Sequence, residues 1–304
     1  MRAASTIILN PNAGSAIGME TFRDEVAKIL PGSRVELSEG PGDCGRIIDR
    51  ALAQGCDTIV AAGGDGTLNG VINAVAEREA DVTLGLLPLG TGNDFARTVN
   101  IPTDLEHALA VLREGRSHRI DLIKATTATT ERYFVNVSAG GFSSKVSEVA
   151  DTELKETWGP LCYARSVIGA LPELDNYETS IILDGSEEIT TPAYNIVVAN
   201  ARYVAAGIPI APTAVVDDGL ADLIILPVAS LGELAALAPA TLLGKHLGSE
   251  KIIHRRARRI EVTSTPQMRF NTDGELLPVE PVTFQVLPSY LRFIVGPQPL
   301  QDPE

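Results

Sequence analysis

Residues able to bind phosphate gather in a glycine-rich turn, GGDGTLN, from Gly63 to Asn69. The run before it, Thr58 to Val60, is rich in β-branched residues and indicates a buried strand. Apolar positions after the turn recur at helical spacing, and we predict a helix from Asn69 to Ala76. The glycines then lie beside a helix N-terminus, whose unpaired N–H groups and partial positive charge favour phosphate.

A carboxylate, Asp65, lies inside this turn. It would repel a bound phosphate unless a cation or a hydroxyl lay between them, so the turn predicts a magnesium nucleotide or a polarised acceptor. The chain has no GxxxxGK[ST] motif and no GxGxxG with an acidic partner, so this is another class of phosphate site. The alternative interpretation is a glycine turn that only reverses the chain.

Two further loops follow predicted strands. Asn10 to Gly14 follows an apolar strand at Thr6 to Leu9, and a second glycine-rich turn, Leu89 to Arg97, follows a buried strand at Val82 to Pro88. Loops after the strands of a βαβα series share one edge of a parallel sheet, so we expect the two glycine turns to lie side by side. A simple strand exit is the alternative for the first loop.

After about Asp121 the pattern becomes that of a mostly antiparallel β domain. Helices are predicted at about Pro160 to Leu171 and at Leu231 to Leu243, and a last short strand at Arg292 to Val295. The other predicted strands are 133–137, 179–183, 193–198, 223–226, 260–263, 267–271 and 282–286.

Composition narrows the class of protein. A chain of 304 residues with 44% hydrophobic content favours two globular domains. A formal charge of −14 argues against nucleic acid and against general electrostatic capture by anionic membrane. Three cysteines without metal-ligand spacing fit a reducing compartment, and no run is apolar enough for a signal peptide or a membrane helix. We therefore expect a cytoplasmic protein.

Several motifs together resemble those of the diacylglycerol kinase catalytic-domain family, in particular its soluble bacterial lipid kinases, which are also similar to sphingosine and ceramide kinases. GGDGT alone is shared with NAD kinases and phosphofructokinases, so the longer motifs carry the resemblance. They are NPNAG at 10–14, GGDGTLN at 63–69, PLGTGNDFAR at 88–97, NVSAGGF at 136–142, APTAVVDDGLAD at 211–222 and NTDGE at 271–275.

This resemblance implies an α/β nucleotide domain with a parallel sheet, residues 1–122 with 289–304, and a mostly antiparallel β-sandwich for the lipid, residues 123–288. The implied reaction transfers the γ-phosphate of ATP, with Mg²⁺, to the hydroxyl of diacylglycerol or a related lipid. The protein would meet its substrate transiently at the inner membrane face. The oligomeric state is left undecided, with a homodimer as one alternative. The alternatives are a soluble-metabolite kinase of the NAD-kinase type and a catalytically silent lipid sensor.

The resemblance also implies roles for individual residues. Asp65 would hold catalytic magnesium or orient the hydroxyl, and Glu275 or Asp273 would be the general base, because a lipid hydroxyl must lose its proton to a carboxylate. Without the family, the Asp-Gly pair at 273–274 indicates only a hairpin turn. ATP would be lined by Asn10, Pro11, Asn12, Ala13, Gly14, Ser38, Gly63, Gly64, Asp65, Gly66, Thr67, Leu68, Asn69 and Thr91.

A structural magnesium site is implied at the DDGLAD segment. Its ligands would be the Asp218 carboxylate and the main-chain carbonyls of Val215 and Leu220, with Asp121 reaching the ion through water. The same residues without the family indicate a β-turn.

Two features depart from the family or from the charge of the chain. Relatives commonly carry a glycine triplet where this chain has Ala205-Ala206-Gly207, so two added methyl groups would narrow this site. The run from His254 to Arg259 contains four arginines, which indicates either a local membrane-facing patch or the protected edge of a sheet.

Overall fold

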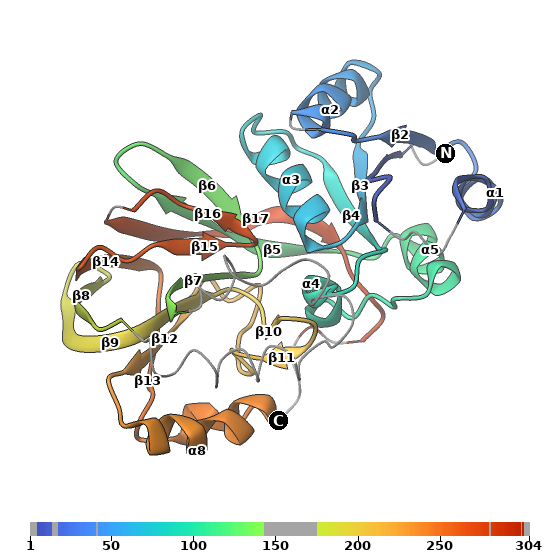
Figure 1. Ribbon diagram of the computed structural model, residues 1–304. Helices are drawn as coiled ribbons and strands as arrows, with labels where there is room; N and C mark the ends of the chain where they lie inside the picture. Colours follow the sequence, from blue (N-terminus) through green and yellow to red (C-terminus); the bar gives the residue numbers. More distant parts are fainter. Residues whose placement is uncertain are drawn as a thin grey trace. The chain divides into compact units, whose positions relative to one another are not determined.

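The computed structural model describes residues 5–13, 18–40, 42–142, 175–279, 281–298 and 300, and Figure 1 shows its helices and strands. The chain forms two compact units. The first unit is Met1–Ile120 with Ser289–Glu304, and the second is Asp121–Pro288. The sequence-based boundaries were 122/123 and 288/289, so the first differs from the observed division by two residues.

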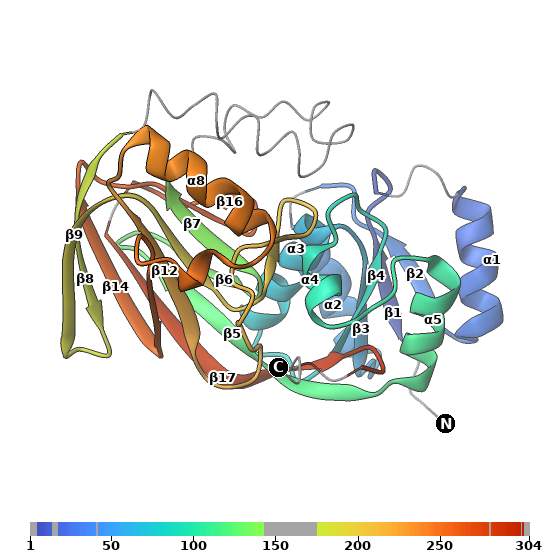
Figure 2. The same ribbon diagram turned by 90° about the horizontal axis from the view of Figure 1, so that it is seen from below.

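The first unit contains a parallel sheet with helices on both faces. Its strand order is β2-β1-β3-β4, and Arg292 and Phe293 at the end of β17 (Val282–Ile294) continue it in parallel beside β4. Helices α2 and α3 pack together on one face and α1 and α5 on the other, as Figures 1 and 2 show. The elements are β1 (Thr6–Leu9), α1 (Met19–Ile29), β2 (Arg34–Leu37), α2 (Asp43–Ala53), β3 (Thr58–Gly63), α3 (Asp65–Ala76), β4 (Thr83–Pro88), α4 (Asp94–Thr98) and α5 (Leu105–Glu114).

Helix α3 begins at Asp65, four residues before the predicted start at Asn69. The amides of Thr67 and Leu68 donate to the carbonyl oxygen of Gly64 at 3.0 and 3.1 Å, which closes the first turn within the glycine motif. Asp65 and Gly66 are therefore the first two residues of the helix rather than part of a loop before it.

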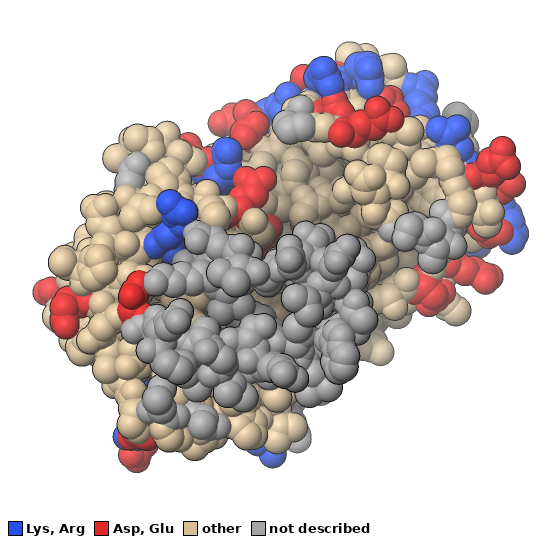
Figure 3. All heavy atoms as spheres, in the orientation of Figure 1, with Lys and Arg blue, Asp and Glu red and all other residues tan. Residues whose placement is uncertain are grey.

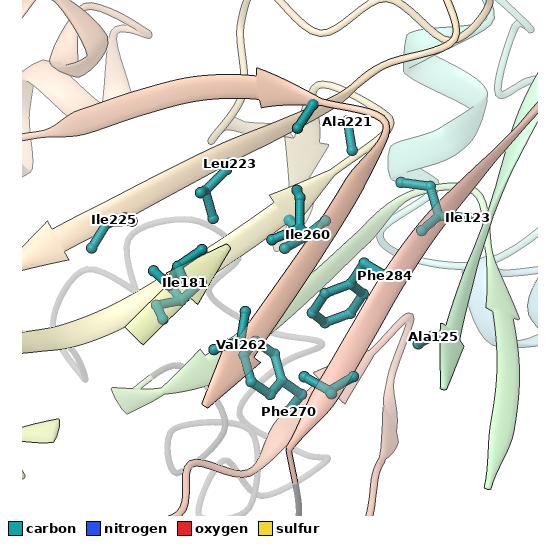
Figure 4. Packing of buried hydrophobic residues seen from close by; sticks show 14 of the residues in the cluster. Ile123, Ala125, Ile181, Ala221, Leu223, Ile225, Ile260, Val262, Phe270 and Phe284 are labelled. Atoms are coloured by element: carbon teal, nitrogen blue, oxygen red, sulfur yellow. The ribbon is translucent and has the colours of Figure 1, made fainter. Parts of the chain in front are cut away.

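The second unit is built from antiparallel strands around a large apolar core and a second, smaller apolar cluster. In β8 the side chains alternate, with Tyr177, Ile181 and Leu183 buried, as expected for a strand with one face on a core. Figure 4 shows part of this core, where Phe284 packs edge-on against Phe270 with ring centroids 5.3 Å apart. The elements are β6 (Glu131–Phe134), β7 (Val137–Gly141), β8 (Tyr177–Leu183), β9 (Glu187–Ala199), β10 (Tyr203–Val204), β11 (Ile208–Pro209), β12 (Ala221–Pro227), α8 (Leu231–Leu242), η2 (His246–Gly248), β13 (Ile253–Ala257), β14 (Arg259–Thr265), β15 (Phe270–Thr272) and β16 (Glu275–Leu276).

Two strands belong to both units, β5 (Ser117–Thr126) and β17 (Val282–Ile294). The prediction of separate strands at 282–286 and 292–295 was wrong. Pro288 and Ser289 suggest a break, and Ser289 has a positive φ of 52°, yet the strand continues through them. The helix predicted at about 160–171 lies outside the described residues.

Candidate functional site

Three loops of the first unit meet at the ends of β1, β3 and β4. The Asn10 amide N–H donates to Ala62 O at 3.0 Å, and its side-chain Nδ2 donates to Thr67 Oγ1 at 3.3 Å. The side-chain oxygen of Asn10 accepts the amide of Asn12 at 3.0 Å. Asn10 therefore fixes its own loop against the glycine turn at the start of α3.

The two glycine turns are in backbone contact, as predicted. A Cβ at Gly90 would lie 2.5 Å from the Cα of Gly64, and a Cβ at Gly63 would lie 2.2 Å from Thr67 Oγ1. None of these glycines has a positive φ. Glycine is therefore needed at these positions because neighbouring atoms lie too close for a Cβ, and not because the backbone adopts a left-handed conformation. Gly66 differs, because a Cβ there would meet nothing within 4 Å among the described residues. Open space at the second residue of a helix is where a phosphate would approach the N–H groups.

Asp65 links the two turns through its carboxylate. Its Oδ2 accepts the amide of Asp94 and its Oδ1 accepts the amide of Phe95, both at 3.1 Å. It therefore caps the short helix α4, a structural role that the sequence did not indicate. The side chain is only partly buried.

A second carboxylate, Asp94, faces the same space as Asp65. A Cβ built on Gly92 would lie 3.0 Å from Asp65 Oδ2 and 3.6 Å from Asp94 Oδ2, and Asp94 is 6% exposed. Asp94 is not among the residues that the sequence motifs assign to a site. The available signal was a carboxylate in the second glycine turn, on the same edge of the sheet as the first.

The other predicted nucleotide residues differ in exposure. Leu68 and Asn69 are each 2% exposed, and Asn69 Oδ1 accepts from Asn73 Nδ2 at 2.6 Å, so both belong to the packed face of α3. Ser38 Oγ lies 3.6 Å from Cys44 Sγ. Pro11, Asn12 and Thr91 are exposed, Ala13 is half-buried, and Gly14 lies outside the described residues.

In the second unit, Asp273 holds the start of β7. Its Oδ1 accepts the amide of Val137 at 2.8 Å, and its Oδ2 accepts the amides of Val135 and Asn136 at 3.2 and 3.3 Å. Three backbone donors around one carboxylate fix its position. Asp273 has a φ of 45°, which places it in the tight turn between β15 and β16.

Glu275, two residues later, has a different environment. Glu275 is exposed on β16, and its carboxylate is 3.3 Å from Arg132 Nε. A long, solvated side chain beside one arginine can reach a substrate proton, whereas the Asp273 oxygens are occupied by the backbone.

The residues predicted to hold structural magnesium also lie together in the second unit. Asp121 is fully buried, and its Oδ2 accepts the amide of Gly219 directly at 2.7 Å. Asp218 Oδ1 accepts the amide of Leu220 at 3.0 Å, and its Oδ2 forms an ion pair with Arg256 Nη2. Val215 precedes Val216, whose carbonyl accepts the Asp121 amide at 2.7 Å. Within the described ranges, no three His, Cys, Asp or Glu side chains form a metal-ligand group.

The arginine run lies on β13 and at the start of β14, and β13 pairs with β12 alone among the described strands. Arg255 Nε is 3.0 Å from Glu187 Oε1 and Arg259 Nε is 3.1 Å from Glu261 Oε1. Figure 3 shows a different region, the end of the first unit that carries α1 and α2, where blue basic and red acidic side chains are interspersed. Local pairing favours the protected sheet edge over a membrane-facing patch.

These features define a two-unit protein that combines an α/β unit built on a parallel sheet with a mostly antiparallel, β-sandwich-like unit. Residues 4–125 match the diacylglycerol kinase catalytic domain, and residues 136–295 match the YegS C-terminal NAD kinase beta sandwich-like domain. The chain belongs to the diacylglycerol kinase catalytic-domain family.

Individual relatives agree with this assignment. A diacylglycerol kinase of Staphylococcus saprophyticus is 34% identical over 278 residues, covering 90% of each chain. One of Staphylococcus aureus is 33% identical, covering 90% of this chain and 87% of the relative. A solved structure from Bacillus anthracis has a TM-score of 0.80 at 24% identity, covering 97% of this chain and 95% of that one, which shows the fold.

Among the described residues, no helix has the length and apolar character needed to cross a membrane.

Proposed function

We propose that this protein is an ATP-dependent lipid kinase that transfers the γ-phosphate of ATP to the hydroxyl of diacylglycerol or a related lipid. The proposal rests chiefly on the arrangement of the first unit, where two glycine turns meet and the space beside Gly66 at the N-terminus of α3 is open. This arrangement, in a chain of the diacylglycerol kinase family, supports a phosphate seat.

Within the proposal, the nucleotide phosphates approach the first N–H groups of α3. The Asn10 loop lies beside this end through its contact with Thr67, and Gly66 leaves room for the ligand. The side chains of Leu68 and Asn69 support the helix from behind and do not contact ATP. Ser38 and Thr91 stay candidate contacts.

The paired carboxylates of Asp65 and Asp94 fit a divalent cation. Carboxylate oxygens are the donors that Mg²⁺ prefers, and both residues face the space beside Gly92. A bound Mg²⁺ would neutralise charge on the phosphates. Asp65 also holds the amides of Asp94 and Phe95, which fixes its orientation.

In the second unit, we assign Glu275 as the general base and Asp273 as the positioning residue. The lipid hydroxyl oxygen forms a bond to the γ-phosphorus, the bond between that phosphorus and the β,γ-bridging oxygen breaks, and ADP leaves. The hydroxyl proton passes to the Glu275 carboxylate. Asp273 fixes the Asp273-Gly274-Glu275 turn against the backbone of residues 135–137.

The acyl chains of such a substrate keep it in a bilayer, so the enzyme must contact a membrane surface transiently. The proposed location is the cytoplasm and the inner membrane face. Because three of the four arginines in the run, Arg255, Arg256 and Arg259, form local ion pairs, membrane contact by another surface is part of the proposal.

The test is incubation of the purified protein with γ-labelled ATP, Mg²⁺ and a mixed lipid extract containing diacylglycerol. The expected result is label in a single lipid fraction, which co-migrates with phosphatidic acid if diacylglycerol is the substrate. Asp65→Asn serves as the inactive control. Label only in a water-soluble product would indicate a metabolite kinase, and lipid binding without label would indicate a sensor, so either result overturns the proposal.

A further inference from the structure

The turn from Asp217 to Leu220, here called the DDGL turn, is closed by the protein's own groups. Asp121 binds the Gly219 amide from one side, and Asp218 binds the Leu220 amide within the turn. Gly219 has a φ of 75°, a conformation that favours glycine. The remaining oxygen of Asp218 contacts the guanidinium of Arg256.

Strand pairing sets the position of Arg256. It lies directly opposite Asp222 in the antiparallel register of β13 and β12, and its Nε is 3.6 Å from Asp222 Oδ2. His254 lies on the same face of β13, and its Nε2 is 2.6 Å from Asp222 Oδ1. One guanidinium thus contacts both Asp218 and Asp222.

Asp222 requires such a partner, because its side chain is 1% exposed. A buried carboxylate is tolerated in a folded protein only when it is paired or neutralised. Arg256 supplies that charge while it also contacts Asp218, which lies in the DDGL turn two residues before Leu220.

These contacts do not fit a divalent ion at Asp218. Unlike Asp65, whose oxygens accept only neutral amides, Asp218 has its Oδ2 atom in an ion pair with a guanidinium, and a cation bound beside that guanidinium would be repelled by it. Asp121 likewise contacts the turn directly, through the Gly219 amide.

The geometry points to Arg256 as the resident cation of the DDGL turn, in the place where the family resemblance implies a magnesium ion. The second unit of this chain is then stabilised by a guanidinium that joins β13 to β12 and to the turn before it. This inference concerns the fold of the second unit and does not depend on which lipid the enzyme phosphorylates.

The test compares metal dependence in the parent, in Arg256→Met and in the matched control Arg255→Met. Met keeps most of the length of the side chain and removes its charge. Arg255 is the neighbour on the same strand, and its partner Glu187 is 51% exposed, so the control removes an arginine without touching the turn. Thermal unfolding is measured without nucleotide, in chelator and in excess Mg²⁺ at equal ionic strength.

We expect the melting temperature of the parent and of Arg255→Met to be the same in chelator and in Mg²⁺. Arg256→Met should melt at a lower temperature in chelator and recover part of the loss in Mg²⁺, because the ion replaces the lost charge. Bound Mn²⁺, counted by electron paramagnetic resonance in the Asp65→Asn background, should rise by one ion per chain only in Arg256→Met.

Two results would overturn the inference. One is a parent that already binds an ion whose stabilising effect Arg256→Met leaves unchanged. The other is a folded Arg256→Met that takes up no ion. If this variant does not fold, Asp218→Asn decides: an equal loss of melting temperature in chelator and in Mg²⁺ supports the guanidinium, and a loss confined to Mg²⁺ supports the metal.

Discussion

Asp273 and Glu275 are separated by one residue, yet their contacts assign them different work. Asp273→Asn replaces one acceptor oxygen by a donor that faces the amides of residues 135–137. We expect a loss of about 1–3 kcal/mol in the free energy of unfolding. Because Asn adopts positive φ readily, the backbone of the turn is not the cause.

Glu275→Gln should have the opposite profile. The exposed side chain contributes little to stability, so urea unfolding should be unchanged while kcat falls roughly 10²–10⁴-fold. Measuring both quantities for both variants separates the roles. An active Glu275→Gln together with a stable, inactive Asp273→Asn would reverse the assignment.

Asp65→Asn tests the cation-binding pair. The amide can still accept one of the two α4 amides, so we expect a stability loss of only about 1 kcal/mol. Turnover should fall at least a hundredfold, because the charge opposite the phosphates is lost. Activity within about a factor of two of the parent would contradict this prediction.

At the scale of the element, the first turn of α3 offers a matched set of glycine substitutions. Gly66→Ala adds a methyl group to open space at the second position of the helix, so stability should be retained while ATP affinity falls at least tenfold. Gly63→Ala places its Cβ against Thr67 and should destabilise the fold by about 1–3 kcal/mol.

Gly232→Ala is the control for Gly66→Ala. Gly232 is also the second residue of a helix, α8, and a Cβ there also meets nothing within 4 Å among the described residues. Its ATP affinity and stability should match the parent. Unfolding curves and titration calorimetry supply the two measurements, and unchanged ATP binding by Gly66→Ala would remove the phosphate seat from α3.

The segment Ala205-Ala206-Gly207 forms the turn of the hairpin between β10 and β11. Ala205 and Ala206 have φ values of 50° and 64°, a left-handed conformation that costs alanine roughly 1–2 kcal/mol per residue. Changing either to Gly relieves this strain but adds freedom to the unfolded chain, so we expect a net gain of up to about 1 kcal/mol by chemical denaturation. A loss of stability on both changes would show that the methyl groups pack usefully.

Sequence patterns predicted these elements unequally. The buried strands β3 and β4 and the two glycine turns were evident, because β-branched runs followed by glycines have few other uses. Helix α5 and strands β5 and β13 were missed, the last because its exposed arginines hide an edge strand. Asp65 contacts Asp94 in α4, 29 residues later, and Asp273 contacts Val135, 138 residues earlier. No local sequence pattern predicts contacts between residues so far apart in the chain.

At the scale of the whole molecule, stability should depend on pH through His246. Its side chain is 2% exposed, and Nε2 lies 2.9 Å from the carbonyl of Ile210, so Nε2 carries the proton. Among the described residues Nδ1 has no hydrogen-bond partner. Burial, and to a smaller extent the charge of His254, lowers the pKa of His246 below its ordinary 6.5.

A lowered pKa means that the unfolded chain takes up this proton first as the pH falls. The stability associated with neutral His246 is therefore complete above about pH 6.5 and is lost as the pH falls toward the folded pKa. His246→Gln keeps a donor for Ile210 and does not titrate, so its melting temperature should fall less between pH 8 and pH 5. Parallel curves for variant and parent would contradict this prediction.

The crossing strands β5 and β17 make the second unit an insertion into the first. Arg119 Nη1 donates to the carbonyl oxygens of Ser289 and Tyr290 at 3.3 and 3.4 Å, so the two ends at which the first unit stops and resumes lie together. A domain whose two ends lie close together can be exchanged for another without changing the strand order of the sheet into which it is inserted. If the proposed function holds, replacement of residues 121–288 by the corresponding segment of a relative should transfer that relative's lipid preference and leave the proposed ATP-binding residues of the first unit in place.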